Sequence, residues 1–210
     1  MLTEKIILNR NLYLGEGKHK VVYAHPEDIN LCIKILRNEP DEDFDREMKY
    51  RRTLGKRAES MTLLTKYFGE VNTSLGKGYL FERVTDYDGE PSKSLAEVFD
   101  SVTTDRKKLT MLENVLMDFK QVYFKEKFFP AGIDLKNYLL QKVTATEMRT
   151  RIIDNIGTSA HIPVEYYFDY FTEKRVKRYW RRLTDFIGEN YSDLFPPEFM
   201  EMLSDIEGNK

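Results

Sequence analysis

The chain has little cysteine, no long apolar run and almost no excess of charge of either sign. Its 210 residues include one cysteine, Cys32, so an intrachain disulfide is excluded and a reducing compartment, the cytoplasm, is expected. No apolar run approaches the ~18 residues that a membrane-spanning helix needs. The formal net charge is only −2. The overall charge of the protein therefore does not attract nucleic acid, and any basic surface must be local.

The residues that are present describe a folded protein with two differently built halves. Apolar residues make up 41% and charged residues 32%, which is typical of a globular chain. Short apolar runs and glycine turns predict an N-terminal part rich in strands, with one helix that has acids at its start and a glycine after its end. Apolar residues at helical spacing dominate the second part. The expected strands lie at 12–14, 21–23, 31–36, 67–73, 78–84 and in a hairpin over 138–153; the expected helices lie at 41–54, 94–99, 105–127, 164–187 and after Pro196.

Lys34 lies in the middle of an apolar strand and is the first candidate for a functional side chain. An ammonium group there needs either a partner or a solvent-facing edge, because unpaired burial is expensive. The strand alone does not decide between the two. Glu47, on the helix that follows, is beside the apolar stripe and could pair with Lys34 and aim it at phosphate oxygens. An exposed helical carboxylate is the alternative for Glu47.

A glycine turn precedes this strand. Gly15 and Gly17 flank Glu16 between two short strands, and glycine there lets backbone N–H groups approach a phosphate without a Cβ in the way. A plain hairpin turn explains the same residues, since glycine is the usual turn residue.

The third candidate group lies around the hairpin at 138–153. Asp134 and Asn137 precede its first strand, and Asp154 follows its second. The hairpin would bring these three side chains to one end of a sheet. Two carboxylates and an amide there are typical of a proton acceptor beside Mg²⁺ ligands, the arrangement of phosphoryl transfer. Each residue alone could also be an ordinary turn former.

The order of these signals resembles the protein-kinase-like fold. More closely, the chain resembles the bacterial YrbL family, small kinase-like proteins associated with the PhoP regulatory network. The resemblance extends from about residue 10 to residue 187. It is carried by residues 14–20, 23–28, 32–35, 88–92 and 154–157. It implies an α+β fold with a β-rich N-lobe at residues 1–85 and a reduced helical C-lobe at residues 86–210.

The resemblance also implies roles for individual residues, with ATP and Mg²⁺ as cofactors. Gly15 and Gly17 would cover the phosphates, and Lys34, held by Glu47, would contact them. The segment from Glu82 to Val84 would be the hinge whose backbone meets adenine. Asp134 would orient or deprotonate a hydroxyl of an unidentified small-molecule or protein substrate. Asn137 and Asp154 would hold Mg²⁺.

Several departures from the kinase pattern leave a pseudokinase open as the alternative. Lys20 stands where the glycine loop has its third glycine, and Gly132-Ile133 replaces His-Arg before Asp134. Asn137 follows Asp134 by three positions rather than five. Only about 50 residues follow Gly157, so the part of a kinase that binds peptides is largely missing. Whether the chain is an enzyme stays open at this point.

A basic helix at 174–182 supports a second alternative. Its apolar residues recur at helical spacing, which favours a packed helix with a solvated basic face. Binding of nucleic acid or a membrane surface through the basic side chains is the less favoured interpretation.

Overall fold

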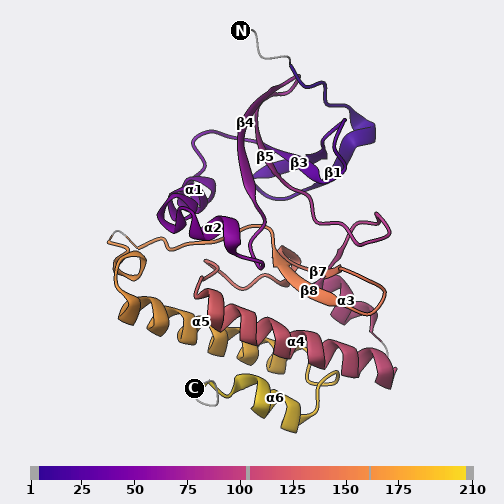
Figure 1. The fold of residues 1–210 in the computed structure, drawn as a ribbon, viewed down its shortest axis with the longest axis vertical. Helices are drawn as coiled ribbons and strands as arrows, with labels where there is room; N and C mark the ends of the chain where they lie inside the picture. Colours follow the sequence, from indigo (N-terminus) through magenta and orange to yellow (C-terminus); the bar gives the residue numbers. More distant parts are fainter. Residues whose placement is uncertain (1–4, 103–104, 161, 207–210) are drawn as a thin grey trace.

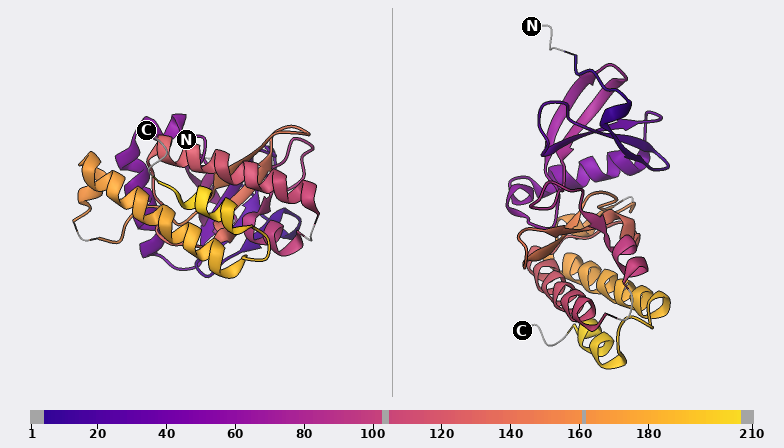
Figure 2. Two further views of the ribbon diagram at one scale, coloured as in Figure 1. Left: turned by 90° about the horizontal axis from the view of Figure 1, so that it is seen from below. Right: turned by 90° about the vertical axis from the view of Figure 1, so that its right-hand side faces the viewer.

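A computed structural model describes residues 5–102, 105–160 and 162–206 of the chain. Figure 1 shows a sheet-rich N-terminal part above a helical C-terminal part, and Figure 2 shows the same two parts from other sides. The protein therefore has the mixed α+β class expected from the sequence, with strands concentrated toward the N-terminus and helices toward the C-terminus.

The N-terminal part is built on a five-stranded antiparallel sheet with the strand order β1-β2-β3-β5-β4. Strand β3 is central, between β2 and β5, and is therefore not an edge strand. The strands are β1 (Tyr13–Glu16), β2 (Lys20–Ala24), β3 (Leu31–Leu36), β4 (Tyr67–Thr73) and β5 (Gly76–Glu82); a 3₁₀ turn, η1 (Arg10–Leu12), precedes them.

Helix α1 (Glu42–Leu54) lies at the lower left of this sheet in Figure 1, crosses beneath it in the right-hand view of Figure 2, and has the boundaries that its sequence predicts. The Asp41 side chain caps the helix by accepting the Phe44 N–H at 2.9 Å, and Gly55 ends it with a φ of 53°. Phe44 packs with Tyr79 and the buried Cys32 in a small cluster under the sheet. The short helix α2 (Arg57–Ser60) follows.

The C-terminal part combines a second sheet, in the order β6-β7-β8, with packed helices. Its elements are β6 (Lys93–Ser94), α3 (Leu95–Ser101), α4 (Arg106–Glu126), η2 (Leu135–Asn137), β7 (Tyr138–Lys142), β8 (Met148–Ile152), η3 (Val164–Tyr166), α5 (Asp169–Asn190) and α6 (Pro197–Ser204). Helices α4 and α5 run side by side in all three views, and they lie below this sheet in Figure 1 and in the right-hand view of Figure 2. Their shared core includes Phe119, Tyr123 and Trp180, whose Nε1 donates to the Leu203 carbonyl at 2.9 Å.

One expected helix begins later than predicted. The apolar spacing predicts a helix from residue 164, but Val164–Tyr166 forms a 3₁₀ turn and α5 starts at Asp169. The ring of Tyr166 stacks on Tyr50 of α1 at 4.9 Å, and the extended Phe168 precedes the helix. This long-range packing turns the chain toward α1 before α5 can begin.

The two parts are joined by more than the connection after β5. The segment between α2 and β4 pairs with the end of β8: the Ile152 N–H donates to the Leu63 carbonyl at 2.6 Å, and the Thr65 N–H donates to the Ile152 carbonyl at 3.2 Å. Asp154 is two residues beyond Ile152, so these two hydrogen bonds hold it close to the segment that leads into β4 of the N-terminal sheet. In the part of the chain that the structure describes, no helix is long and apolar enough to cross a bilayer.

Candidate functional site

Lys34 is buried in the central strand β3, where only 5% of its surface is exposed. Its Nζ donates to the Ile153 carbonyl at 2.7 Å and lies 4.1 Å from the centre of the Phe81 ring. These contacts settle the question that the sequence leaves open, because Lys34 is a partnered buried cation rather than a solvent-facing one. Its ammonium group therefore lies beside the backbone that leads to Asp154.

A second lysine reaches the same place. Nζ of Lys20, the first residue of β2, lies 2.6 Å from Oδ1 of Asp154, and the Asn155 N–H donates to the same oxygen at 2.9 Å. The sequence shows Lys20 only as a departure from a glycine loop. The register of β2 and β3 explains why Lys20 lies near Lys34. Val22 is opposite Lys34, and Lys20 is two residues from Val22, so both lysines project from the same face of the sheet.

The charge of Asp154 is set by these two lysines. Burial raises the pKa of its carboxyl group, but the ammonium groups of Lys34 and Lys20 outweigh burial and hold that pKa well below its usual range. Asp154 is therefore an ionised carboxylate between two cations, one on each of two neighbouring strands.

Glu47 lies close to this cluster but does not form the expected ion pair with Lys34. Its carboxylate pairs instead with Arg51, one helical turn further along α1, at 2.9 Å, and both side chains are buried. Among the ion pairs of the described residues, none joins Glu47 to Lys34. The i,i+4 spacing places Arg51 on the same helix face, while the Ile153 carbonyl takes the ammonium of Lys34.

The predicted hairpin of β7 and β8 brings Asn137 beside the Asp154 segment. The Ile153 N–H donates to the Asn137 carbonyl at 3.0 Å, and Tyr138 pairs with Ile152. Asp134 is exposed and caps η2, because its Oδ1 accepts the Lys136 N–H at 3.0 Å. All three predicted residues thus lie at the same end of the small sheet.

The segment expected to act as a hinge is only partly available to a ligand. The N–H groups of Glu82 and Arg83 donate to the carbonyls of Lys66 and Asn30 at 2.9 and 2.7 Å. The Glu82 carboxylate pairs with Arg151 at 2.6 Å. For the N–H of Val84, by contrast, no hydrogen bond to another described residue is found. Val84 itself is buried, with 6% of its surface exposed.

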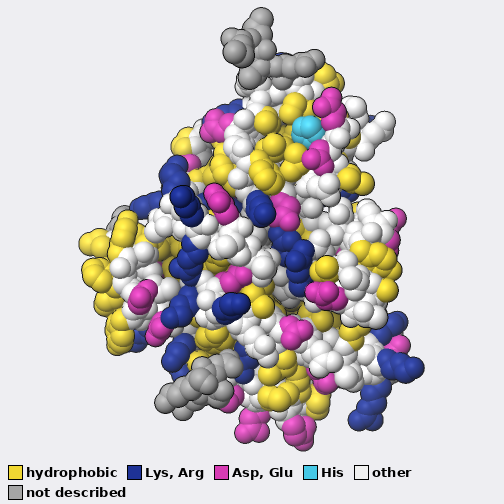
Figure 3. Space-filling model, viewed as in Figure 1, with side chains coloured by type: hydrophobic (Ala, Val, Ile, Leu, Met, Phe, Trp, Pro, Cys, Tyr) yellow, Lys and Arg dark blue, Asp and Glu magenta, His cyan; other side chains and the backbone are white. Residues whose placement is uncertain are grey.

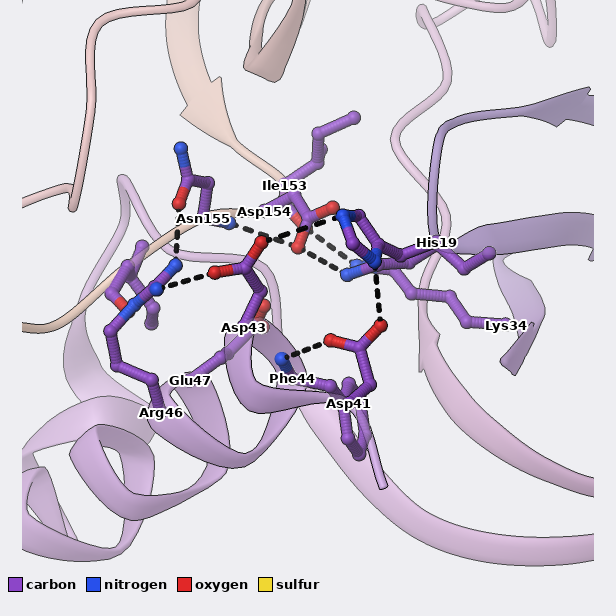
Figure 4. A network of polar contacts seen from close by, with 12 residues as sticks. His19, Lys34, Asp41, Asp43, Phe44, Arg46, Glu47, Ile153, Asp154 and Asn155 are labelled. Carbon is purple, nitrogen blue, oxygen red and sulfur yellow. Dashed lines mark hydrogen bonds and ion pairs between the residues drawn. The ribbon is translucent and has the colours of Figure 1, made fainter. Parts of the chain in front are cut away.

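The glycine loop is open on its outer side and attached to α1. A Cβ built on Gly15 or Gly17 would meet no atom within 4 Å, and neither residue has the positive φ that favours glycine. Packing therefore gives no reason for glycine at these positions. His19, in the same loop, contacts Asp41 at 3.1 Å and Asp43 at 3.8 Å, as Figure 4 shows.

The donor set around Asp154 fits a metal ion only together with a phosphate ligand. Within the described ranges, no three His, Cys, Asp or Glu side chains are placed to hold a metal. Asp154 offers a carboxylate oxygen, and Asn137 is placed beside it through its main-chain carbonyl. Mg²⁺ commonly binds one or two protein oxygens together with substrate phosphates. A nucleotide would therefore have to bring the remaining ligands.

Two hollows in the surface lie away from this cluster. One, of about 760 Å³, is lined by residues of α1, α2, β4 and β5, including Phe44, Met48 and Tyr67. The other, of about 420 Å³, lies between the 86–93 connection and α4. Neither is lined by Lys34, Asp134 or Asp154.

The basic helix packs through its apolar side, as its spacing predicts. Val176, Tyr179, Trp180 and Leu183 of α5 are buried. Basic side chains are interspersed with acidic and hydrophobic ones on the face in Figure 3. Binding of nucleic acid or a membrane surface by α5 stays a prediction. The basic residues of α5 that are exposed are Lys174, Lys177, Arg178, Arg181 and Arg182.

Comparison with known proteins places the chain in a family. The model of the family described as PhoP regulatory network protein YrbL matches residues 6–187, a range that contains every site residue named above. The chain belongs to the YrbL family. It is 30% identical over 180 residues to the uncharacterised YrbL proteins of Escherichia coli K12 and Shigella flexneri, covering 84% of this chain and 85% of each relative.

Proposed function

We propose that this protein is kinase-like: residues 1–85 and 86–210 are its two lobes, and it binds ATP with Mg²⁺ between them and transfers a phosphoryl group to a hydroxyl of an unidentified substrate. One observation carries the proposal. The ammonium group of Lys34, from the central strand, binds the Ile153 carbonyl next to Asp154, although 119 positions separate Lys34 from Ile153, and its charge lowers the pKa of the Asp154 carboxyl group. A buried cation beside an ionised carboxylate supports phosphate and metal binding.

The surrounding residues have matching roles in this proposal. The ammonium group of Lys34 would bind phosphate oxygens as a point charge. Gly15 and Gly17 would let the loop backbone approach the phosphates. Asp134, exposed at the start of η2, would accept a proton from the substrate hydroxyl or orient it. Asn137 and Asp154 would contact Mg²⁺, which would neutralise charge on the phosphates.

A pseudokinase is the second candidate, and the ion pair of Lys20 with Asp154 favours it. That pair occupies an oxygen that a metal would otherwise contact. The spacing of three between Asp134 and Asn137 also shortens the loop that carries the proton acceptor. In this case the nucleotide would hold the two lobes for a partner, without turnover.

Thermal unfolding with ATP or GTP and MgCl₂ tests nucleotide binding by the full chain. A ligand at about 100 times its Kd stabilises the native state by about 2.7 kcal/mol, which raises the Tm of a chain this size by roughly 5–10 °C. We expect such a shift for the wild type and its loss in Lys34→Ala and Asp154→Ala. Lys49→Ala, an exposed lysine of α1, is the matched control and should keep the shift.

Turnover separates the two candidates. If the protein is an enzyme, a sensitive assay for ADP release should detect nucleotide turnover, and Asp134→Asn should abolish it while leaving the nucleotide-induced Tm shift intact. Binding without turnover in the wild type would favour the pseudokinase. No Tm shift with either nucleotide would contradict the proposal.

A further inference from the structure

Lys20 forms the most unexpected contact of the site. Its side chain is only 10% exposed, its Nζ lies 2.6 Å from Oδ1 of Asp154, and the ring of Phe44 is 5.7 Å away. An ion pair between an exposed lysine and a carboxylate contributes little, because water screens the two charges. The ion pair of Lys20 with Asp154 is mostly withdrawn from water, so its electrostatic attraction is stronger. Figure 4 shows the surroundings of Asp154 near the start of α1.

We propose that the ammonium group of Lys20 takes the place of one divalent cation at Asp154, so that this chain binds nucleotide phosphates without a strict need for Mg²⁺. The inference rests on the nucleotide-binding function proposed above. It assigns to Lys20 the role of a binding residue that sets the metal dependence of the site.

The hydrogen bonds of Asp154 support this assignment. Oδ1 accepts from both Lys20 Nζ and the Asn155 N–H. A metal ion at that oxygen would have to displace the ammonium group and compete with the N–H. Metal binding through Oδ1 would thus cost the ion pair, whereas a phosphate could bind to the free side of the ammonium and leave the pair in place.

The balance of charge points the same way. Lys20 and Lys34 together carry two positive charges around the single negative charge of Asp154, and the nearby Glu47 is matched by Arg51. Lys20, Lys34 and Asp154 taken alone therefore keep one positive charge without any metal. Without Lys20, the charges of Lys34 and Asp154 would cancel, and an added cation would be needed to attract a polyphosphate.

The backbone holds Lys20 in this position. The Gly17 N–H donates to the Lys20 carbonyl at 2.9 Å, and the Arg37 N–H donates to the His19 carbonyl at 2.8 Å. Lys20 also pairs with Leu36 in the register of β2 and β3. Its side chain thus projects from a fixed strand rather than from the tip of the loop, as a stand-in for a bound ion requires.

Isothermal titration of the full chain with ATP, once in MgCl₂ and once in EDTA, tests the inference. We expect the wild-type Kd to differ by less than about threefold between the two buffers. Lys20→Met, which keeps an unbranched stem and removes the charge, should lose at least about tenfold in affinity in EDTA, the loss of one charged hydrogen bond, and recover part of it with Mg²⁺. Lys18→Met, an exposed neighbour in the same loop, should behave as the wild type.

The outcomes separate this inference from the function on which it rests. Wild-type binding that appears only with Mg²⁺ and is lost in Lys34→Ala would overturn the role of Lys20 and leave nucleotide binding established. No ATP binding in either buffer would overturn both. If Lys20→Met fails to fold by circular dichroism, Lys20→Arg replaces it: the retained charge predicts binding in EDTA, and a strict Mg²⁺ requirement in that variant would contradict the inference.

Discussion

Arg46 of α1 donates a hydrogen bond from Nη2 to Oδ1 of Asn155, the residue after Asp154, at 2.7 Å. The same guanidinium pairs with Asp43 at 2.6 Å, and its Nε donates to the Ile156 carbonyl at 3.4 Å. Asn155 has a φ of 59°, a left-handed conformation that asparagine tolerates better than most residues. Helix α1 thereby fixes the turn that orients the Asp154 carboxylate (Figure 4).

Replacing Arg46 should loosen this turn. Arg46→Ala removes the donors to Asn155 and Ile156, and we expect a loss of about 1–3 kcal/mol in the free energy of unfolding, the usual cost of hydrogen bonds to a charged group. Urea unfolding measures the change. Arg52→Ala, which removes an exposed arginine from the same helix, is the matched control and should change stability by less than about 0.5 kcal/mol. Equal effects of the two substitutions would show that the contact with Asn155 contributes nothing.

The buried pair of Glu47 and Arg51 should be costly to break from one side. Arg51→Met leaves the Glu47 carboxylate buried without its main partner and the Thr65 carbonyl without its donor, so we expect a loss of about 3–5 kcal/mol. Glu47→Gln combined with Arg51→Met should be less destabilising than the two single changes added together. A double-mutant cycle by urea unfolding measures the coupling, and strict additivity would contradict it.

Gly78 of β5 is required by packing. A Cβ at this position would lie 2.6 Å from Cγ2 of Ile33 in the adjacent central strand. Gly78→Ala should therefore cost about 1–3 kcal/mol, the typical cost of overpacking a core. Gly15→Ala, where a Cβ meets nothing within 4 Å, is the control and should leave the Tm nearly unchanged. A neutral Gly78→Ala would mean that the sheet shifts freely to make room.

Gly17 should behave in the opposite way, because its glycine is not needed by the fold. Gly17→Ala has open space for a Cβ and no positive φ to disturb, so stability should hold. If the loop covers nucleotide phosphates, the added methyl group should weaken ATP binding by about tenfold, which corresponds to about 1.4 kcal/mol. Titration calorimetry with ATP measures this. Unchanged affinity would remove the glycine loop from the proposed site.

The capping box at the start of α3 should make stability depend on acid pH. Ser94 donates hydrogen bonds from its side chain and its backbone to Glu97, which lowers the pKa of that carboxyl group. A lowered pKa in the folded state stabilises the protein above the unfolded pKa of about 4.3, and this contribution is lost as the pH falls through the lower folded value. Glu97→Gln should therefore be less stable than the wild type near neutral pH, and the difference should shrink below about pH 4. Urea unfolding across pH 3–7 checks this, and a gap that is constant with pH would refute it.

Local patterns were sufficient to predict much of the secondary structure. The ends of α1 follow from Asp41 and Gly55, and α4 lies between Asp105 and Lys127, close to its predicted bounds. The hairpin that joins Asn137 to Ile153 also follows from two apolar strands on either side of the polar residues 144–147. These features depend on residues a few positions apart, for which capping and periodicity are the deciding interactions.

The side-chain partners could not be predicted in the same way. The position of Glu47 beside the apolar stripe of the helix after Lys34 predicts a pair with Lys34, but Arg51 is one helical turn from Glu47 and binds its carboxylate. Lys20 reaches Asp154 across 134 positions, and that contact depends on how the N-terminal sheet is placed over the small sheet. The kinase-like fold, the nucleotide and the metal stay predictions, because they depend on the site as a whole.

The single tryptophan gives the protein an optical probe of only one of its halves. Trp180 is almost completely buried between α4, α5 and α6, and its indole N–H donates to Leu203. Its fluorescence therefore follows the helical core and is remote from the N-terminal sheet. Unfolding of the N-terminal sheet alone would hardly change tryptophan emission but would change the far-ultraviolet circular dichroism. If the two signals give transitions that do not coincide, the two halves do not unfold as one unit.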